Sequence, residues 1–81
     1  MIENAHARVG RLLRELRPEH DFSRSADFIA DGLLDSFDVV SLVSGLEAEF
    51  GIRIDGLDIV PENFRDVPSI VELLKRSGVA L

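Results

Sequence analysis

The stretch that decides the fold is residues 32–50, GLLDSFDVVSLVSGLEAEF. Its apolar side chains recur at intervals of three and four residues, which places them on one face of an α-helix. The members of this stripe, which suits a core-facing surface, are Val39, Leu42, Val43, Leu46 and Phe50. Gly51 follows the stripe as a helix-ending residue. The stretch therefore predicts a helix over about residues 36–50.

The same helix carries a second stripe, which begins apolar and ends mixed. Its members are Phe37, Val40, Ser41, Ser44, Glu47 and Ala48.

The rest of the chain predicts further helices and almost no strand. A helix stripe runs from Ile2 to Leu16 and ends at Pro18. The connection over residues 19–34 holds apolar anchors that should pack it across the helices: Phe22, Phe28, Ile29, Leu33 and Leu34. Residues 61–64 predict one helical turn, and Asp66 predicts the cap of a last helix through Ser77. The expected fold is all-α: a single domain over residues 1–81, built as a small four-helix bundle of three main helices and one short one, with a long loop between the first two.

Composition narrows the class of protein. The 81 residues carry a net charge of −6, and residues 27–66 hold ten acidic and two basic side chains. That balance argues against nucleic acid. The acids form either ordinary solvated helix faces or an acidic surface for basic partners, and the charge alone does not choose between the two. No apolar run is long enough to span a membrane, and the N-terminal segment does not resemble a secretory signal. The chain has no cysteine, which agrees with a cytoplasmic protein and excludes thiol catalysis by its own side chains.

Candidates for catalysis or metal binding are few. The two histidines, His6 and His20, are scattered, and neither is near a plausible nucleophile in the sequence. The acids Asp31, Asp35 and Asp38 lack the order of a calcium-binding loop. We therefore expect neither an enzyme nor a metal site, and a small hydrolase or metal protein that uses the histidines stays as a minor hypothesis.

Ser36 lies between Asp35 and Phe37 at the start of the predicted helix, and two interpretations are open. Either Asp35 or Ser36 could be the N-cap, a role that contributes about 1 kcal/mol. Alternatively, Ser36 is a point of attachment. A phosphodiester there would face free backbone N–H groups and the positive end of the helix dipole. The surrounding acids would then be contacts for the basic, metal-bearing enzyme that installs it.

The chain resembles the acyl carrier and peptidyl carrier proteins over roughly residues 27–74. The resemblance lies in GLLDSFD at residues 32–38 and in the apolar register that follows. The matching positions after this core are Val40, Leu42, Val43, Leu46, Glu47, Phe50, Ile54, Phe64, Val67 and Ile70. The family fold is a four-helix bundle with a long first loop, in agreement with the periodicity.

This resemblance implies a cofactor and a set of roles. Ser36 would carry 4′-phosphopantetheine, transferred from coenzyme A by a phosphopantetheinyl transferase, and Asp35 would help that enzyme recognise the site. The partner-binding side chains would be Phe37, Asp38, Val40 and Glu47. The arm would hold an acyl or aminoacyl cargo as a thioester, loaded by a ligase or transferase and passed to downstream biosynthetic enzymes. We expect a monomer, since a carrier must visit several enzymes.

Some positions differ from the fatty-acid carriers. Phe37 stands where leucine is common, Ser41 and Ala48 stand where acids are common, and Gly32 lies four residues before the serine, not three. These features resemble stand-alone D-alanyl carriers and discrete carriers of secondary metabolism. The alternative function is an interaction module that keeps the carrier fold without a loaded arm and binds partner helices or lipid through Phe37 and Val40.

Overall fold

The computed structural model describes residues 4–80 and contains three α-helices: α1 (Ala5–Leu16), α2 (Ser36–Phe50) and α3 (Val67–Arg76). Three single 3-10 turns lie between them: η1 (Phe22–Arg24), η2 (Gly56–Asp58) and η3 (Pro61–Asn63). Residues 4–80 form no strand, so the all-α prediction is confirmed. The short fourth helix expected at residues 61–64 is the 3-10 turn η3, and Ile2 lies outside the described residues.

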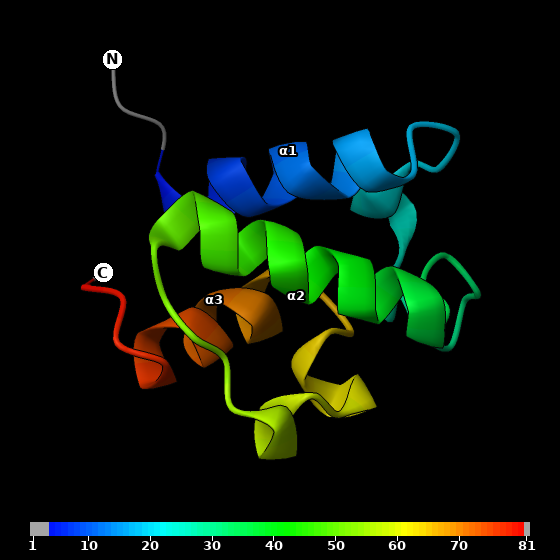
Figure 1. The fold of residues 1–81 in the computed structure, drawn as a ribbon. Helices are drawn as coiled ribbons and strands as arrows, with labels where there is room; N and C mark the ends of the chain where they lie inside the picture. Colours follow the sequence, from blue (N-terminus) through cyan, green and yellow to red (C-terminus); the bar gives the residue numbers. More distant parts are fainter. Residues whose placement is uncertain (1–3, 81) are drawn as a thin grey trace.

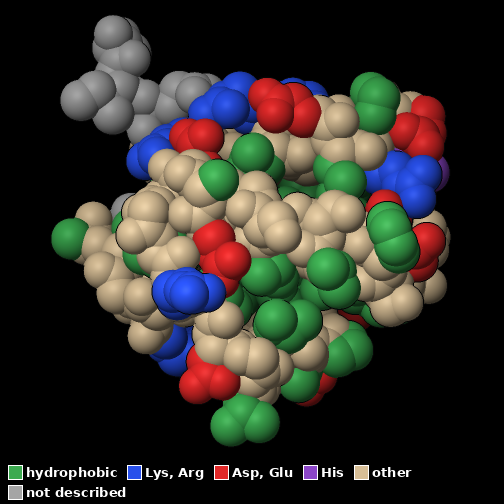
Figure 2. Space-filling model, viewed as in Figure 1, with side chains coloured by type: hydrophobic (Ala, Val, Ile, Leu, Met, Phe, Trp, Pro, Cys, Tyr) green, Lys and Arg blue, Asp and Glu red, His purple; other side chains and the backbone are tan. Residues whose placement is uncertain are grey.

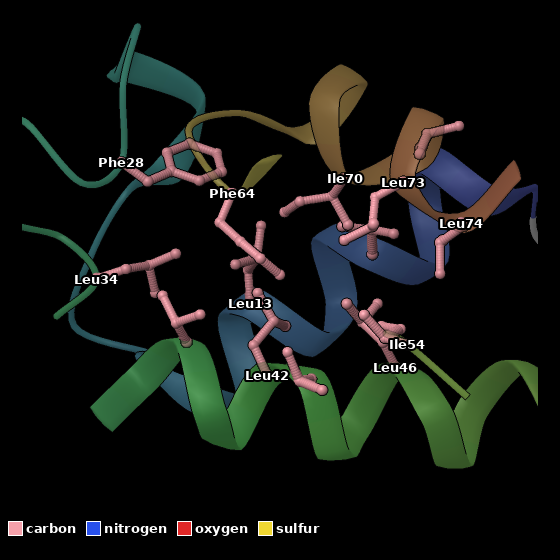
Figure 3. Packing of buried hydrophobic residues seen from close by; sticks show 14 of the residues in the cluster. Leu13, Phe28, Leu34, Leu42, Leu46, Ile54, Phe64, Ile70, Leu73 and Leu74 are labelled. Carbon is pink, nitrogen blue, oxygen red and sulfur yellow. The ribbon is translucent and has the colours of Figure 1, made fainter. Parts of the chain in front are cut away.

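The three helices surround one core (Figure 1). Helix α1 packs against both α2 and α3, and it runs antiparallel to α2. The core contains side chains from all three helices and from the connections, several of which converge in Figure 3. The largest completely buried side chains are Leu13, Phe28, Leu34, Leu46, Phe64, Ile70, Leu73 and Leu74. Each contributes about 1.5–3 kcal/mol by leaving water.

The connection between α1 and α2 is long but anchored. Phe28 and Leu34 are buried in the core, and the rings of Phe22 and Phe28 meet edge to face with centroids 5.0 Å apart. The backbone N–H of Phe28 donates to the carbonyl of Arg65 at 2.6 Å, which joins this connection to the segment before α3. The expectation of a packed loop is therefore confirmed.

The ends of α2 and α3 follow local sequence. Gly51 ends α2 with φ of 66°, a left-handed conformation that glycine adopts without strain. Asp66 caps α3 by accepting the N–H of Ser69 at 2.8 Å, as the sequence predicts. None of the helices within residues 4–80 is long and apolar enough to cross a bilayer.

Arginines of α1 hold the C-terminal end of α2. Arg8 and Arg11 each place a guanidinium nitrogen 2.9 Å from the Glu49 carboxylate. The Arg8 guanidinium also lies over the Phe50 ring, 4.1 Å from its centroid. These contacts fix the position of α2 along α1, in addition to the apolar packing between the two helices.

Candidate functional site

Asp35, and not Ser36, caps helix α2. The backbone of Asp35 is extended, and its carboxylate accepts the N–H of Asp38 at 2.8 Å. In return, the Asp38 carboxylate accepts the N–H of Asp35 at 3.1 Å. This reciprocal pair is a capping box formed by two aspartates. It answers the question that the sequence left open about the two capping candidates.

Ser36 is the first residue of α2, and its side chain is exposed. Within residues 4–80, its hydroxyl makes no hydrogen bond, and neither do the backbone N–H groups of Ser36 and Phe37. The hydroxyl is therefore accessible to another molecule and has no part in the cap. A phosphate attached to it would meet two unpaired N–H groups at the positive end of the helix.

The two aspartates beside Ser36 have opposite environments. The Asp35 side chain is 64% exposed, whereas Asp38 is 5% exposed and bound to Arg17 at 3.0 Å. Burial by itself would raise the pKa of Asp38, but hydrogen bonds from Arg17 and from the Asp35 N–H, together with the Arg17 charge, hold that pKa below its usual value. Asp38, expected from the sequence to contact partners, is turned inward.

Two apolar side chains stand out of the surface on the first turns of α2. Phe37 is 80% exposed and Val40 is 62% exposed. Figure 2 shows hydrophobic side chains gathered over α2 and over the connection with η2 and η3, which lies below α2 in that view. Exposed large apolar groups that lie together are typical of a surface that another molecule covers.

An apolar groove of about 300 Å³ opens directly beside Ser36. It lies between the start of α2, the end of the first connection and the segment that leads into η3. Its lining residues are Ile29, Leu34, Asp35, Ser36, Val39, Val40, Ile59, Val60 and Pro61. Sequence analysis missed the contribution of residues 59–61, although these three apolar residues interrupt a largely polar segment.

Glu47 lies towards the other end of α2. Its carboxylate accepts the backbone N–H of Ile54 at 2.8 Å, so it holds the segment after the helix. At 1.5 Å of rise per residue, it is about 15 Å along the helix from Phe37. Its expected contact with partners stays a prediction. Another exposed apolar residue that the sequence analysis did not single out is Leu57 on η2, 86% exposed.

The histidines lie apart. His6 is exposed on α1, and the ring of His20 meets that of Phe22 edge to face at 6.2 Å. Among residues 4–80, no three side chains of the metal-binding types gather at one point.

A small helical domain that presents an unbonded serine hydroxyl next to an exposed carboxylate has the arrangement of a carrier domain. The family model for the phosphopantetheine attachment site matches residues 7–76, and the chain belongs to this family of acyl and peptidyl carrier proteins. The family binds 4′-phosphopantetheine covalently, and its carrier domains are generally non-catalytic. No curated protein and no solved structure shows a significant match to the chain.

Proposed function

We propose that this protein carries an acyl or aminoacyl group as a thioester on a 4′-phosphopantetheine arm attached to Ser36 and presents it to partner enzymes. The observation that carries the proposal is the Ser36 hydroxyl, which is exposed and unbonded within residues 4–80 because Asp35 provides the cap. When bound, the arm supplies the thiol that this cysteine-free chain lacks.

The residues around Ser36 suit the attachment step. The unpaired N–H groups of Ser36 and Phe37 can stabilise the phosphate once it is joined to the hydroxyl. The Asp35 carboxylate is exposed and can bind the metal ion or a basic side chain of a phosphopantetheinyl transferase. The buried Asp38 is occupied by Arg17 and adds little repulsion towards that phosphate.

A partner surface adjoins the attachment point. Phe37 and Val40 lie within the first two turns of α2, on the same side of the helix. We infer that a loading ligase or transferase, and the downstream enzymes, bury these two side chains when they reach Ser36. Glu47 would contribute a charged contact further along. We expect the carrier to act as a monomer in the cytoplasm.

The cargo is the least constrained part of the function. Ser41 and Ala48 make α2 less acidic than in fatty-acid carriers, which favours a discrete carrier, such as a D-alanyl or secondary-metabolite carrier. The groove beside Ser36 offers an apolar surface for part of the arm or its cargo. Loading assays with D-alanine, other amino acids and malonyl-type units, each with its own ligase or transferase, would separate these classes.

Intact mass spectrometry tests the attachment. The protein is incubated with coenzyme A, Mg²⁺ and a broad-specificity transferase, beside Ser36→Ala. We expect one mass increase of phosphopantetheine size in the wild type and none in the variant. An increase that persists in Ser36→Ala would refute the assigned site, and no increase with several transferases would argue against loading.

The exposure of Phe37 favours one second candidate, an interaction module that binds partner helices or lipid without a loaded arm. This function requires an unmodified Ser36. Binding would survive Ser36→Ala and would be lost in Phe37→Ala, whereas a carrier loses its function in Ser36→Ala.

A further inference from the structure

Asp38 is the only buried charged residue among residues 4–80. It is the third residue of α2, in the first turn, and its carboxylate accepts hydrogen bonds from two elements of the fold. The backbone N–H of Asp35, the cap of the same helix, donates one hydrogen bond to it. The guanidinium of Arg17, at the end of α1, donates the others, with its Nε 3.0 Å from each carboxylate oxygen of Asp38. A buried carboxylate held in this way depends on both donors.

Arg17 belongs to the opposite end of the first connection. It is the C-cap residue of α1, and its N–H donates to the carbonyl of Leu13. Its Nη2 lies 3.0 Å from Oδ1 of Asp38 and 3.8 Å from Oδ2 of Asp35. One guanidinium therefore faces both carboxylates of the capping box. Arg17 also reaches Glu19 at 3.4 Å, an exposed contact next to it in the chain.

This geometry joins the end of α1 directly to the turn that presents Ser36. If the Arg17 charge were lost, the Asp38 carboxylate would be left buried with a single donor, and it would be more stable turned towards water. Turning outward would break its hydrogen bond to the Asp35 N–H and open the capping box. The first turn of α2 would then fray, and the Ser36 hydroxyl would no longer be held in one orientation.

We propose that Arg17 is a positioning residue for the modification of Ser36: through Asp38 it holds the first turn of α2 in the orientation that the transferase requires. The inference rests on the proposed attachment at Ser36. Arg17 need not touch the transferase, because it acts through the cap. Its effect is therefore expected in the rate of transfer at saturation and not in the affinity for the enzyme.

The test compares Arg17→Gln and Arg17→Lys with the wild type in steady-state transfer of phosphopantetheine from coenzyme A. Arg14→Gln is the matched control, because it removes an exposed α1 arginine that forms no ion pair within residues 4–80. Amide exchange by NMR at Asp35, Asp38 and Val39 reports the state of the first turn. Circular dichroism confirms that each variant is folded at the assay temperature.

For Arg17→Gln we expect a fall in kcat of about tenfold with KM within about twofold of wild type, and faster exchange at the three amides. Arg17→Lys keeps a positive charge near Asp38 but loses the planar guanidinium that contacts both carboxylate oxygens. Its kcat and its amide exchange rates should therefore lie between those of wild type and of Arg17→Gln. Arg14→Gln should match the wild type. If Arg17→Gln is too unstable to assay, Arg17→Lys must show the paired decrease in kcat and protection.

Each other outcome overturns the inference in a recognisable way. Unchanged kcat with faster exchange would make Arg17 merely structural, and a raised KM with unchanged kcat would make it a direct transferase contact. A decrease in kcat for Arg14→Gln as large as that for Arg17→Gln would indicate a general effect of the positive charge of α1. Failure of the proposed function looks different, because the wild type itself would gain no mass.

Discussion

The structure gives the cap of α2 to Asp35, and we propose that the attachment point is the adjacent Ser36, so the two roles can be separated by substitution. Ser36→Ala removes a hydroxyl that makes no hydrogen bond within residues 4–80, and alanine favours helix more than serine does. We expect its free energy of unfolding to lie within about 0.5 kcal/mol of wild type. Asp35→Ala removes the acceptor of the Asp38 N–H, a 2.8 Å hydrogen bond, and should lose about 1 kcal/mol.

Asp35→Asn separates the cap from the charge. Asparagine is about as good an N-cap as aspartate, so stability should stay within about 0.5 kcal/mol of wild type. The exposed carboxylate is nevertheless gone, and we expect slower loading by the transferase. Ser36→Ala should therefore be as stable as wild type but never loaded. Asp35→Asn should also be as stable as wild type but should be loaded slowly. Asp35→Ala should be less stable than wild type and should also be loaded slowly.

Urea unfolding followed by far-UV circular dichroism measures the stabilities, since the chain has neither tryptophan nor tyrosine. With an m-value of about 1 kcal/mol/M, a loss of about 1 kcal/mol moves the midpoint by about 1 M. A midpoint for Ser36→Ala as low as that of Asp35→Ala would refute the assignment of the cap. Loading of Asp35→Asn at the wild-type rate would refute the role of the carboxylate in recognition.

Further predictions concern the core, the buried carboxylate, the helix end and the segment beside the groove. Leu46→Ala empties a completely buried position and should lower the free energy of unfolding by about 2–5 kcal/mol in urea titrations. Because its pKa is lowered in the folded state, Asp38 stabilises the protein above its unfolded pKa of about 3.9 and loses that effect as pH falls through the folded pKa. The stability difference between wild type and Asp38→Asn, measured from pH 7 to pH 2, should therefore shrink below about pH 4. Gly51→Ala forces a side chain into a left-handed conformation and should cost about 1 kcal/mol, seen as a Tm lowered by about 4–8 °C. Amides of residues 56–63 should exchange faster than those of residues 42–46, and equal protection would contradict this.

The parts of the fold that could be predicted are those encoded by neighbouring residues. The stripe from Val39 to Phe50, with capping candidates before it and Gly51 after it, locates α2 to within a residue. Asp66 does the same for the start of α3. Sequence alone could not choose between Asp35 and Ser36 as cap, because the choice depends on which backbone is extended.

The parts that could not be predicted depend on residues distant in sequence. The resemblance predicted Asp38 as a partner contact, but Asp38 is buried and bound by Arg17, 21 residues earlier. The groove requires Ile59 and Val60 to lie opposite α2, which no helical periodicity encodes. The resemblance to carrier proteins predicted Ser36 as the attachment site, and the structure shows that its hydroxyl makes no hydrogen bond within residues 4–80 because Asp35 provides the cap.

The arginine contacts of α1 bear on how the groove can change its width. Helix α2 is joined to α1 by ion pairs near both of its ends, at Asp38 and at Glu49. Within residues 4–80, the opposite side of the groove, around Val60, has no ion pair to α1; it is held by hydrogen bonds among close neighbours, such as the Asn63 side chain to the Asp58 carbonyl at 2.7 Å, and by one from Arg76 of α3 to Asn63 at 3.1 Å. The α2 side of the groove is thus held in place on α1, and the side around Val60 is the one that can shift relative to it. Substitutions in residues 56–63 are therefore expected to alter the volume beside Ser36 while helix α2 keeps its place on α1.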